Sequence, residues 1–404
     1  MENYIFLVSI AIILLTTKIL GDVTNKVNMT QVVGALLAGV LIGPSCFNWV
    51  NETDFVNKTA EIGVIFLMFM AGLDTDVKQL KKNSVACVVI ASLGVLLPLI
   101  GGTLAYYCYF EQGATDYEEI LKAVFIGVVL TATSVSITVE ALREMGKLDG
   151  KVGSAILGAA VIDDIMGIVV LTIVISLKDE SVSLVGVLLK ILAYAALMAL
   201  LGYLCQRWQT RIDHNLGRRR ITTYVVAACF IIAYISETYF GVADITGAYL
   251  LGLFLSRHEI KSEIARKLSV PSYLFFSPIF FASVGLKVEL SGITGSLIVF
   301  SLILLGVAIL TKIIGCGLAA KICKFNWADS LKVGVGMMTR GEVALIVAQK
   351  GLAVGMVDAV YFTAVILLII VSSVTTPLAL KTLFAKHPSK DHSSAVAVNE
   401  SGKA

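Results

Sequence analysis

Two adjacent aspartates, Asp163 and Asp164, interrupt the apolar stretch GAAVIDDIMGIVVL at residues 158–171. A charge at the bilayer centre costs roughly 2.5–3.5 kcal/mol on insertion scales, and such residues face the protein interior or a water-filled cavity. Neighbouring helical positions point about 100° apart, so we expect the two carboxylates to have different partners and roles. Two carboxylates that only stabilise the fold are the alternative, which we disfavour because buried charges are a poor source of stability.

Lys312 is the expected counterion of one aspartate. It lies deep in the apolar segment VAILTKIIGCGL, at residues 307–318, too far from either end for its ammonium group to reach water easily. A lysine there can neutralise one carboxylate and leave the other reactive. The alternative is an ordinary structural ion pair, and a pair that breaks during a functional cycle would satisfy both interpretations.

Two further apolar segments carry polar groups at mid-depth. The stretch LTATSVSIT at residues 130–138 is rich in hydroxyls, including Thr133 and Ser134. Hydroxyls and exposed carbonyls are hard oxygen ligands that suit an alkali cation, although the hydroxyls could instead bond carbonyls of their own helix. The second segment carries Arg340 and Glu342, which do not face each other on a regular helix. We expect a helix break at Gly341, with both charges in structural roles.

The composition sets the class of protein. The chain has 404 residues, of which 57% are hydrophobic and only 15% charged, whereas soluble domains carry about 25% charged residues. The long apolar runs do not alternate as the strands of a membrane barrel would. We therefore predict an all-α polytopic membrane protein. The seven cysteines are scattered without metal-ligand spacing, so we expect neither a metal centre nor a disulfide framework.

The apolar pattern predicts about 13 transmembrane helices. Lys and Arg concentrate in alternate loops, which places the N-terminus outside and the C-terminus in the cytoplasm. The predicted spans cover residues 3–20, 31–44, 58–74, 84–110, 120–142, 152–177, 183–206, 221–238, 241–256, 271–286, 293–320, 328–350 and 357–380.

An internal repeat organises these spans. GALLAGVLIG at 34–43 resembles GAYLLGLFLS at 247–256, and FLMFMAGLDTD at 66–76 resembles IFFASVGLKVE at 279–289, both at an offset of 213 residues. Two six-span halves joined by one span must have opposite orientations, as in many secondary transporters. The predicted parts are a first repeat (1–177), a linking span with a basic loop (178–220), a second repeat (221–386) and a short polar cytoplasmic tail (387–404).

Together these residues resemble the monovalent cation:proton antiporter superfamily, especially its second family, with NapA-type bacterial sodium/proton antiporters most similar. The matching pieces are TATSVSIT (131–138), AAVIDDIMGI (159–168), Lys312 and MMTRGEVALIVA (337–348). They occur in the same order and at similar separations, and the resemblance covers nearly the whole chain. Members of the family often have proline where this chain has Thr339.

The resemblance implies a role for each residue. Asp164 would bind Na⁺ and carry the proton. Asp163 would pair with Lys312 and exchange that bond for a proton or ion during the cycle, and Thr133 and Ser134 would complete the cation site. Arg340 and Glu342 would be structural. The implied fold has two broken crossing helices, a scaffold and a six-helix core that moves like an elevator.

The resemblance also implies a function, which is antiport and not enzyme catalysis. Cytoplasmic Na⁺ would exchange for external H⁺ by electrogenic alternating access, in a homodimer in the plasma membrane that serves pH homeostasis. We expect no cofactor besides the transported ions, no nucleic acid and no soluble regulatory domain. A potassium/proton or dual antiporter is the main alternative, with Li⁺ a further candidate ion. A passive cation channel and a sodium-coupled symporter fit less well.

Overall fold

The computed structural model describes residues 4–26, 29–110, 117–178, 184–207, 221–287, 295–357 and 359–387, and all of its regular elements there are helices. A helix lies in each of the thirteen predicted ranges. Ten are long and apolar enough to cross a membrane, and three shorter apolar helices accompany them. The basic loop at 208–220 and the tail from 388 lie outside the described residues.

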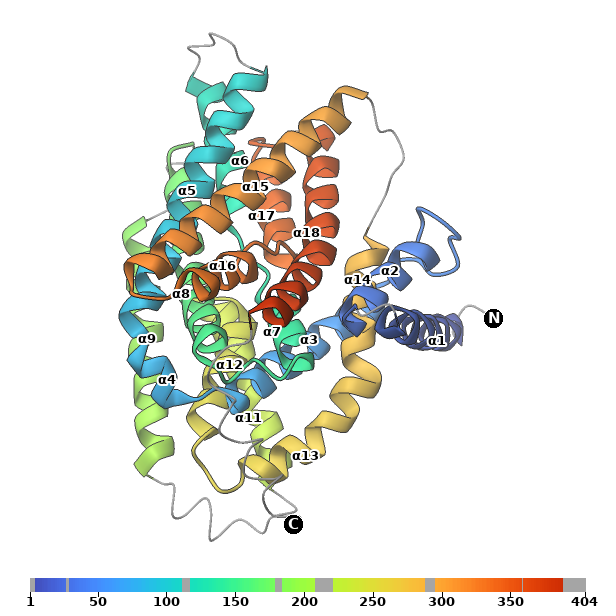
Figure 1. Cartoon of the computed structure of the whole chain (residues 1–404), viewed down its shortest axis with the longest axis vertical. Coiled ribbons are helices and arrows are strands. Elements are labelled where there is room, and N and C mark those ends of the chain that lie inside the picture. The colour runs from blue at the N-terminus through green and yellow to red at the C-terminus, as the bar shows by residue number, and fades with distance from the viewer. Residues whose placement is uncertain are drawn as a thin grey trace.

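We call one group of helices the scaffold helices. In this group α2 packs against α1 and α14, and α3 packs against α12. In Figure 1, α1, α2 and α14 gather on the side of the N-terminus. The members are α1 (Ile5–Lys26), α2 (Gln31–Ile42), α3 (Asp54–Asp74), α11 (Ile221–Ile235), α12 (Asp244–Leu255), α13 (Lys261–Pro271) and α14 (Ser277–Leu286).

The second group, the core helices, packs around α5 and α15, which cross each other in the part of the view away from α13 (Figure 1). Its members are α5 (Ser84–Phe110), α6 (Tyr117–Thr131), α7 (Val135–Glu144), α8 (Lys151–Ser176), α15 (Gly295–Ile322), α16 (Trp327–Gly336), α17 (Glu342–Ala353) and α18 (Ala359–Lys386). The short α4 (Val77–Lys82) leads from α3 into α5, and α9 (Leu184–Arg207) packs on both α8 and α12.

One predicted loop is helical. The polar segment at 261–271 forms α13 and continues through a π-helical turn, Ser272–Phe276, into α14. Ile264 and Leu268 are buried against the scaffold, while Glu263 pairs with Arg266 and Lys267 on the exposed side. This amphipathic pattern stabilises a helix by burying one face, so the segment extends the following span.

Glycines at equivalent positions of the two repeats allow scaffold helices to approach closely. A Cβ atom added to Gly72 of α3 would lie 2.1 Å from the carbonyl oxygen of Tyr249, and one on Gly252 of α12 would lie 2.1 Å from that of Phe69. Gly39 of α2 and Gly285 of α14 approach each other's helix in the same way. Gly39 and Gly252, like Gly72 and Gly285, are 213 residues apart. The two helix pairs are therefore built alike.

Candidate functional site

Two predicted spans are broken, and their breaks meet. Residues 132–134 separate α6 from α7, and residues 337–341 separate α16 from α17. The backbone N–H of Ser134 donates to the carbonyl of Thr339 at 2.8 Å. The Thr138 hydroxyl lies 2.9 Å from both the Gly336 carbonyl and the Thr339 hydroxyl. Backbone groups that a continuous helix would satisfy are thus satisfied across the crossing.

Gly341 permits this close approach. Its backbone is extended, with φ −159° and ψ −140°. A Cβ atom at this position would lie 2.4 Å from the Ser134 hydroxyl oxygen. A side chain here would therefore force the two breaks apart.

Arg340 holds the second break in place. Its guanidinium is fully buried and donates to the Met337 and Met338 carbonyls at 3.4 and 3.2 Å, at the end of α16. It also reaches the Ala308 carbonyl of α15 at 3.4 Å. A cation at a helix C-terminus compensates both the unpaired carbonyls and the helix dipole. Ser372 and Ser373 of α18 bond the backbone of Arg340. Glu342 begins α17, but its side chain lies outside the described residues.

Lys312 and Asp163 form a buried ion pair. The ammonium nitrogen lies 2.9 Å from a carboxylate oxygen, and the two side chains are 0% and 2% exposed. The pair joins α15 to α8 beside Gly94 of α5, where an added Cβ atom would lie 3.5 Å from the Lys312 nitrogen. The same Cβ atom would lie only 2.6 Å from the Cys316 sulfur, so glycine lets α5 pack closely on α15 next to the ion pair.

Asp164 has different surroundings from Asp163. The Thr246 hydroxyl of α12, a scaffold helix, donates to its carboxylate at 3.3 Å. Both aspartates line a cavity of about 60 Å³, together with Thr131 and Ala132 from the first break. The remaining lining comes from the second half of α8, the start of α12 and the start of α17 (Gly167, Ile168, Leu171, Ala243, Val343 and Val347, with Val128 of α6). Such a space holds a few waters or a small cation.

The other predicted cation ligands lie near this cavity but do not line it. The Thr133 hydroxyl is buried and has no hydrogen-bond partner, and the Ser134 hydroxyl lies 3.3 Å from that of Ser136. Sequence reasoning did not assign Thr131 to the site, and it missed Thr246. Thr131 belongs to the same hydroxyl-rich stretch, whereas Thr246 is a lone hydroxyl in an apolar segment, which by itself gives no signal.

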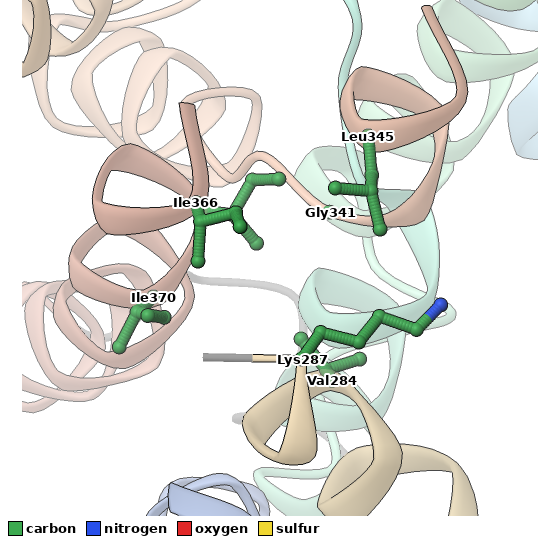
Figure 2. A pocket seen from close by; sticks show the side chains of 7 residues that line it. Val284, Lys287, Gly341, Leu345, Ile366 and Ile370 are labelled. Carbon is green, nitrogen blue, oxygen red and sulfur yellow. The ribbon is translucent and has the colours of Figure 1, made fainter. Parts of the chain in front are cut away.

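A smaller pocket of about 20 Å³ lies beside the second break (Figure 2). Val284 and Lys287 of α14 face Gly341 and Leu345 on one side and Ile366 and Ile370 of α18 on the other. The Lys287 side chain extends toward α17 in this view. No carboxylate is among the described residues that line the pocket, which shows that the contact between a scaffold helix and the core helices is not completely filled here.

The profile of the family described as "Sodium/hydrogen exchanger, transmembrane" matches residues 9–386. The chain belongs to this family of transporters. The Na(+)/H(+)-K(+) antiporter GerN of Bacillus cereus is 38% identical over 384 residues, covering 94% of this chain and 96% of GerN. An Na(+)/H(+) antiporter of Enterococcus hirae is 35% identical over 381 residues, covering 93% and 97%.

The fold agrees with a solved member of the same kind. The sodium proton antiporter MjNhaP1 from Methanocaldococcus jannaschii superposes with a TM-score of 0.72 at 16% identity, over 96% of this chain and 97% of that chain. The predictions of a helical membrane fold and of the exchanger family are therefore confirmed. The finer NapA-type assignment remains a prediction.

Proposed function

We propose that the chain exchanges Na⁺ for H⁺ at Asp164 by alternating access. The observation that carries this proposal is the unequal surroundings of the two aspartates. Both line the small cavity at the crossing of two broken helices, but Lys312 neutralises Asp163, whereas the Thr246 hydroxyl donates a hydrogen bond to Asp164. A carboxylate in such a place can hold either a proton or a Na⁺ ion. Competition for one site that opens alternately to each side is sufficient for exchange.

The orientation of the cavity supports an outward-facing state. In the predicted topology, α6, the second half of α8 and α17 occupy the outer half of the membrane, and they supply most of the cavity lining. Toward the inner side, Arg143 of α7 pairs with Asp74 at the end of α3. Glu144 accepts the backbone N–H groups of Gln31 and Val32, at 2.8 and 3.2 Å. These contacts join core to scaffold and close the inner side.

In this mechanism Asp163 and Lys312 form the switch. If the pair opens when Asp164 exchanges its ion, two protons can move for each Na⁺ ion and transport responds to voltage. We place the protein in the plasma membrane as a homodimer, with the N-terminus outside and a role in pH homeostasis. The apolar side chains that α1 and α9 expose support contact with lipid or with a second subunit (Ile5, Leu7, Val8, Leu15, Ile19, Val185, Leu189, Leu192 and Leu200).

Exchange in proteoliposomes tests the proposal. Wild-type protein should convert an imposed Na⁺ gradient into a pH gradient, and an imposed membrane potential should change the rate. Asp164→Asn should abolish exchange, because the amide cannot carry the proton. Glu61→Gln, on the exposed face of α3, is the matched control and should exchange normally. Full activity of Asp164→Asn would overturn the assignment.

Potassium/proton or dual exchange is the second candidate. It is favoured by the name of the relative GerN, an Na(+)/H(+)-K(+) antiporter that matches nearly the whole chain. The same vesicles, loaded in turn with Na⁺, K⁺ and Li⁺, distinguish the candidates. If protons move only when K⁺ is present, the transported cation is K⁺ and not Na⁺. If protons move with either ion, the protein is a dual antiporter.

A further inference from the structure

A second, larger cavity of about 520 Å³ lies away from the aspartates, where scaffold and core helices meet. It is bounded by α1, α2, α7 and the segment that leads into α14. Its walls are largely apolar (Leu14, Leu15, Val32, Ala35, Leu274, Pro278 and Phe281). Its volume falls within the range of roughly 300–1,000 Å³ that is usual for sites binding organic ligands.

Two buried oxygen atoms of residues that line this cavity have no hydrogen-bond partner. One is a carboxylate oxygen of Glu140 on α7, and the other is the Ser277 hydroxyl at the start of α14. Both side chains belong to residues that are only 4% exposed. Buried polar groups are nearly always hydrogen-bonded, because an unpaired one costs about 1–3 kcal/mol. The two oxygens therefore indicate a ligand that donates hydrogen bonds to both.

The charges around Glu140 favour a cationic donor. The nearest cation, a guanidinium nitrogen of Arg143, is 4.0 Å from the unpartnered oxygen, and another nitrogen of Arg143 is already paired with Asp74. Glu144, which also lines the cavity, is occupied by the backbone N–H groups of α2. The negative charge of Glu140 is thus only partly compensated.

The rim of the cavity points to a ligand that comes from the bilayer. Leu15 and Leu274 line the cavity and are 64% and 71% exposed, on a surface that faces lipid in a membrane protein. Lys18, also on the rim, pairs with Asp22 through an exposed contact of the kind that contributes little stability. In the predicted topology this rim lies near the inner surface of the membrane, at the level of lipid headgroups.

We propose that this cavity binds the headgroup of an aminophospholipid, a lipid that carries a primary ammonium group and a phosphate. The ammonium donates hydrogen bonds to Glu140 and Ser277, the phosphate lies near Lys18, and the acyl chains leave along Leu15 and Leu274. A bare metal ion fits less well, because the described part of the chain contains no cluster of three or more His, Cys, Asp or Glu side chains that could hold one. It would also leave the apolar walls without contacts.

The thermal unfolding midpoint of the purified full chain in detergent, measured against added lipid, tests this site. A ligand that binds only the folded state raises the midpoint. Phosphatidylethanolamine should raise it at lower concentration than phosphatidylcholine, whose quaternary ammonium has no N–H to donate, or phosphatidylglycerol, which has no ammonium. An equal response to all three lipids would overturn the proposal. If soluble phosphoethanolamine stabilises the protein equally well, the ligand does not have to be a lipid from the bilayer.

Substitutions of residues that line the cavity test whether the lipid headgroup binds there. Glu140→Gln should weaken the apparent affinity for phosphatidylethanolamine about ten- to hundredfold, the usual contribution of a charged hydrogen bond. Glu61→Gln, the matched control at an exposed position of α3, should leave it unchanged. Ser277→Ala, which removes a single hydroxyl, should weaken it severalfold and serves also if Glu140→Gln does not fold. Unchanged affinity in either cavity variant would refute the assigned contacts, independently of any exchange activity.

Discussion

At the scale of single residues, Asp163 and Asp164 are neighbours in the chain but have different electrostatic surroundings. Asp163 meets a full opposite charge within 2.9 Å, whereas the Thr246 hydroxyl bonds Asp164 at 3.3 Å. A buried charge that loses its partner is strongly destabilising, because nothing replaces the lost solvation. Burial of the Asp163 carboxylate therefore depends on the charge of Lys312, and this difference is the reason that the proposed mechanism assigns ion exchange to Asp164.

Removing the lysine should expose this dependence. We expect Lys312→Ala to lower the free energy of unfolding by about 3–5 kcal/mol, because Asp163 remains buried without a counterion. Thermal unfolding in detergent measures the loss. The double variant Asp163→Asn/Lys312→Ala should recover much of the stability, and Lys321→Ala, near the end of the same helix, should change it little. A double variant as unstable as Lys312→Ala would show that the unpaired charge of Asp163 is not the cause of the loss.

Substitutions of Thr246 test whether its hydrogen bond affects the competition between Na⁺ and H⁺ at Asp164. Its hydroxyl stabilises the ionised carboxylate, which is the form that binds Na⁺ in the proposed mechanism. Thr246→Val keeps the shape and removes the donor, so the proton should compete better and the apparent KM for Na⁺ should rise about tenfold. Thr246→Ser, which keeps the donor, is the control. The KM is measured as Na⁺-driven proton movement in proteoliposomes, and a normal KM in the valine variant would remove Thr246 from the site.

At the residue scale, the sequence alone predicts the charged members of the candidate site better than its hydroxyl groups. Asp163, Asp164 and Lys312 stand out because a charge in an apolar run is costly and therefore needs a reason. Thr246 does not stand out, because a threonine can satisfy its own hydroxyl on a helix carbonyl. Its contact with Asp164 depends on the packing of a scaffold helix against a core helix, which the local sequence does not encode.

At the scale of elements, close backbone contacts set how the scaffold helices pair. We expect Gly72→Ala and Gly252→Ala each to destabilise the fold by about 1–3 kcal/mol, because the new methyl group would overlap the backbone of the facing helix. Gly306→Ala is the matched control on α15, where an added Cβ atom meets nothing within 4 Å. It should be neutral or stabilising, by up to about 1 kcal/mol. Equal effects in all three, measured by thermal unfolding, would contradict packing as the cause.

The two broken helices show how far the positions of helix breaks can be predicted from the sequence. A break at Gly341 is expected because glycine interrupts helices, and the structure ends α16 at Gly336 and begins α17 at Glu342. The break at 132–134 contains neither glycine nor proline, and only its hydroxyls suggested it. That the breaks meet follows from the hydrogen bonds between Ser134 and Thr339, and between Thr138 and Gly336, which are contacts about 200 residues apart in the chain.

At the scale of the whole molecule, the site is shared between two groups of helices. Asp163, Asp164 and Lys312 lie on core helices, while Thr246 and Ala243 come from the scaffold side. Any movement of the core relative to the scaffold therefore changes the surroundings of Asp164. The same movement must break the contacts on the other side, where Arg143 meets Asp74 and Glu144 meets the start of α2.

A reversible cross-link across that contact tests whether such a movement is required. In a background in which the seven native cysteines are replaced and exchange is retained, Asp74→Cys and Arg143→Cys place one thiol on each group of helices. A short bifunctional methanethiosulfonate reagent should stop Na⁺/H⁺ exchange in proteoliposomes, because it holds the inner side closed, and a reductant should restore it. Either cysteine alone, treated identically, is the control. Exchange at the full rate in protein that is completely cross-linked would show that scaffold and core do not separate at α3 and α7 during transport, and that the ion must reach the inner side by another opening.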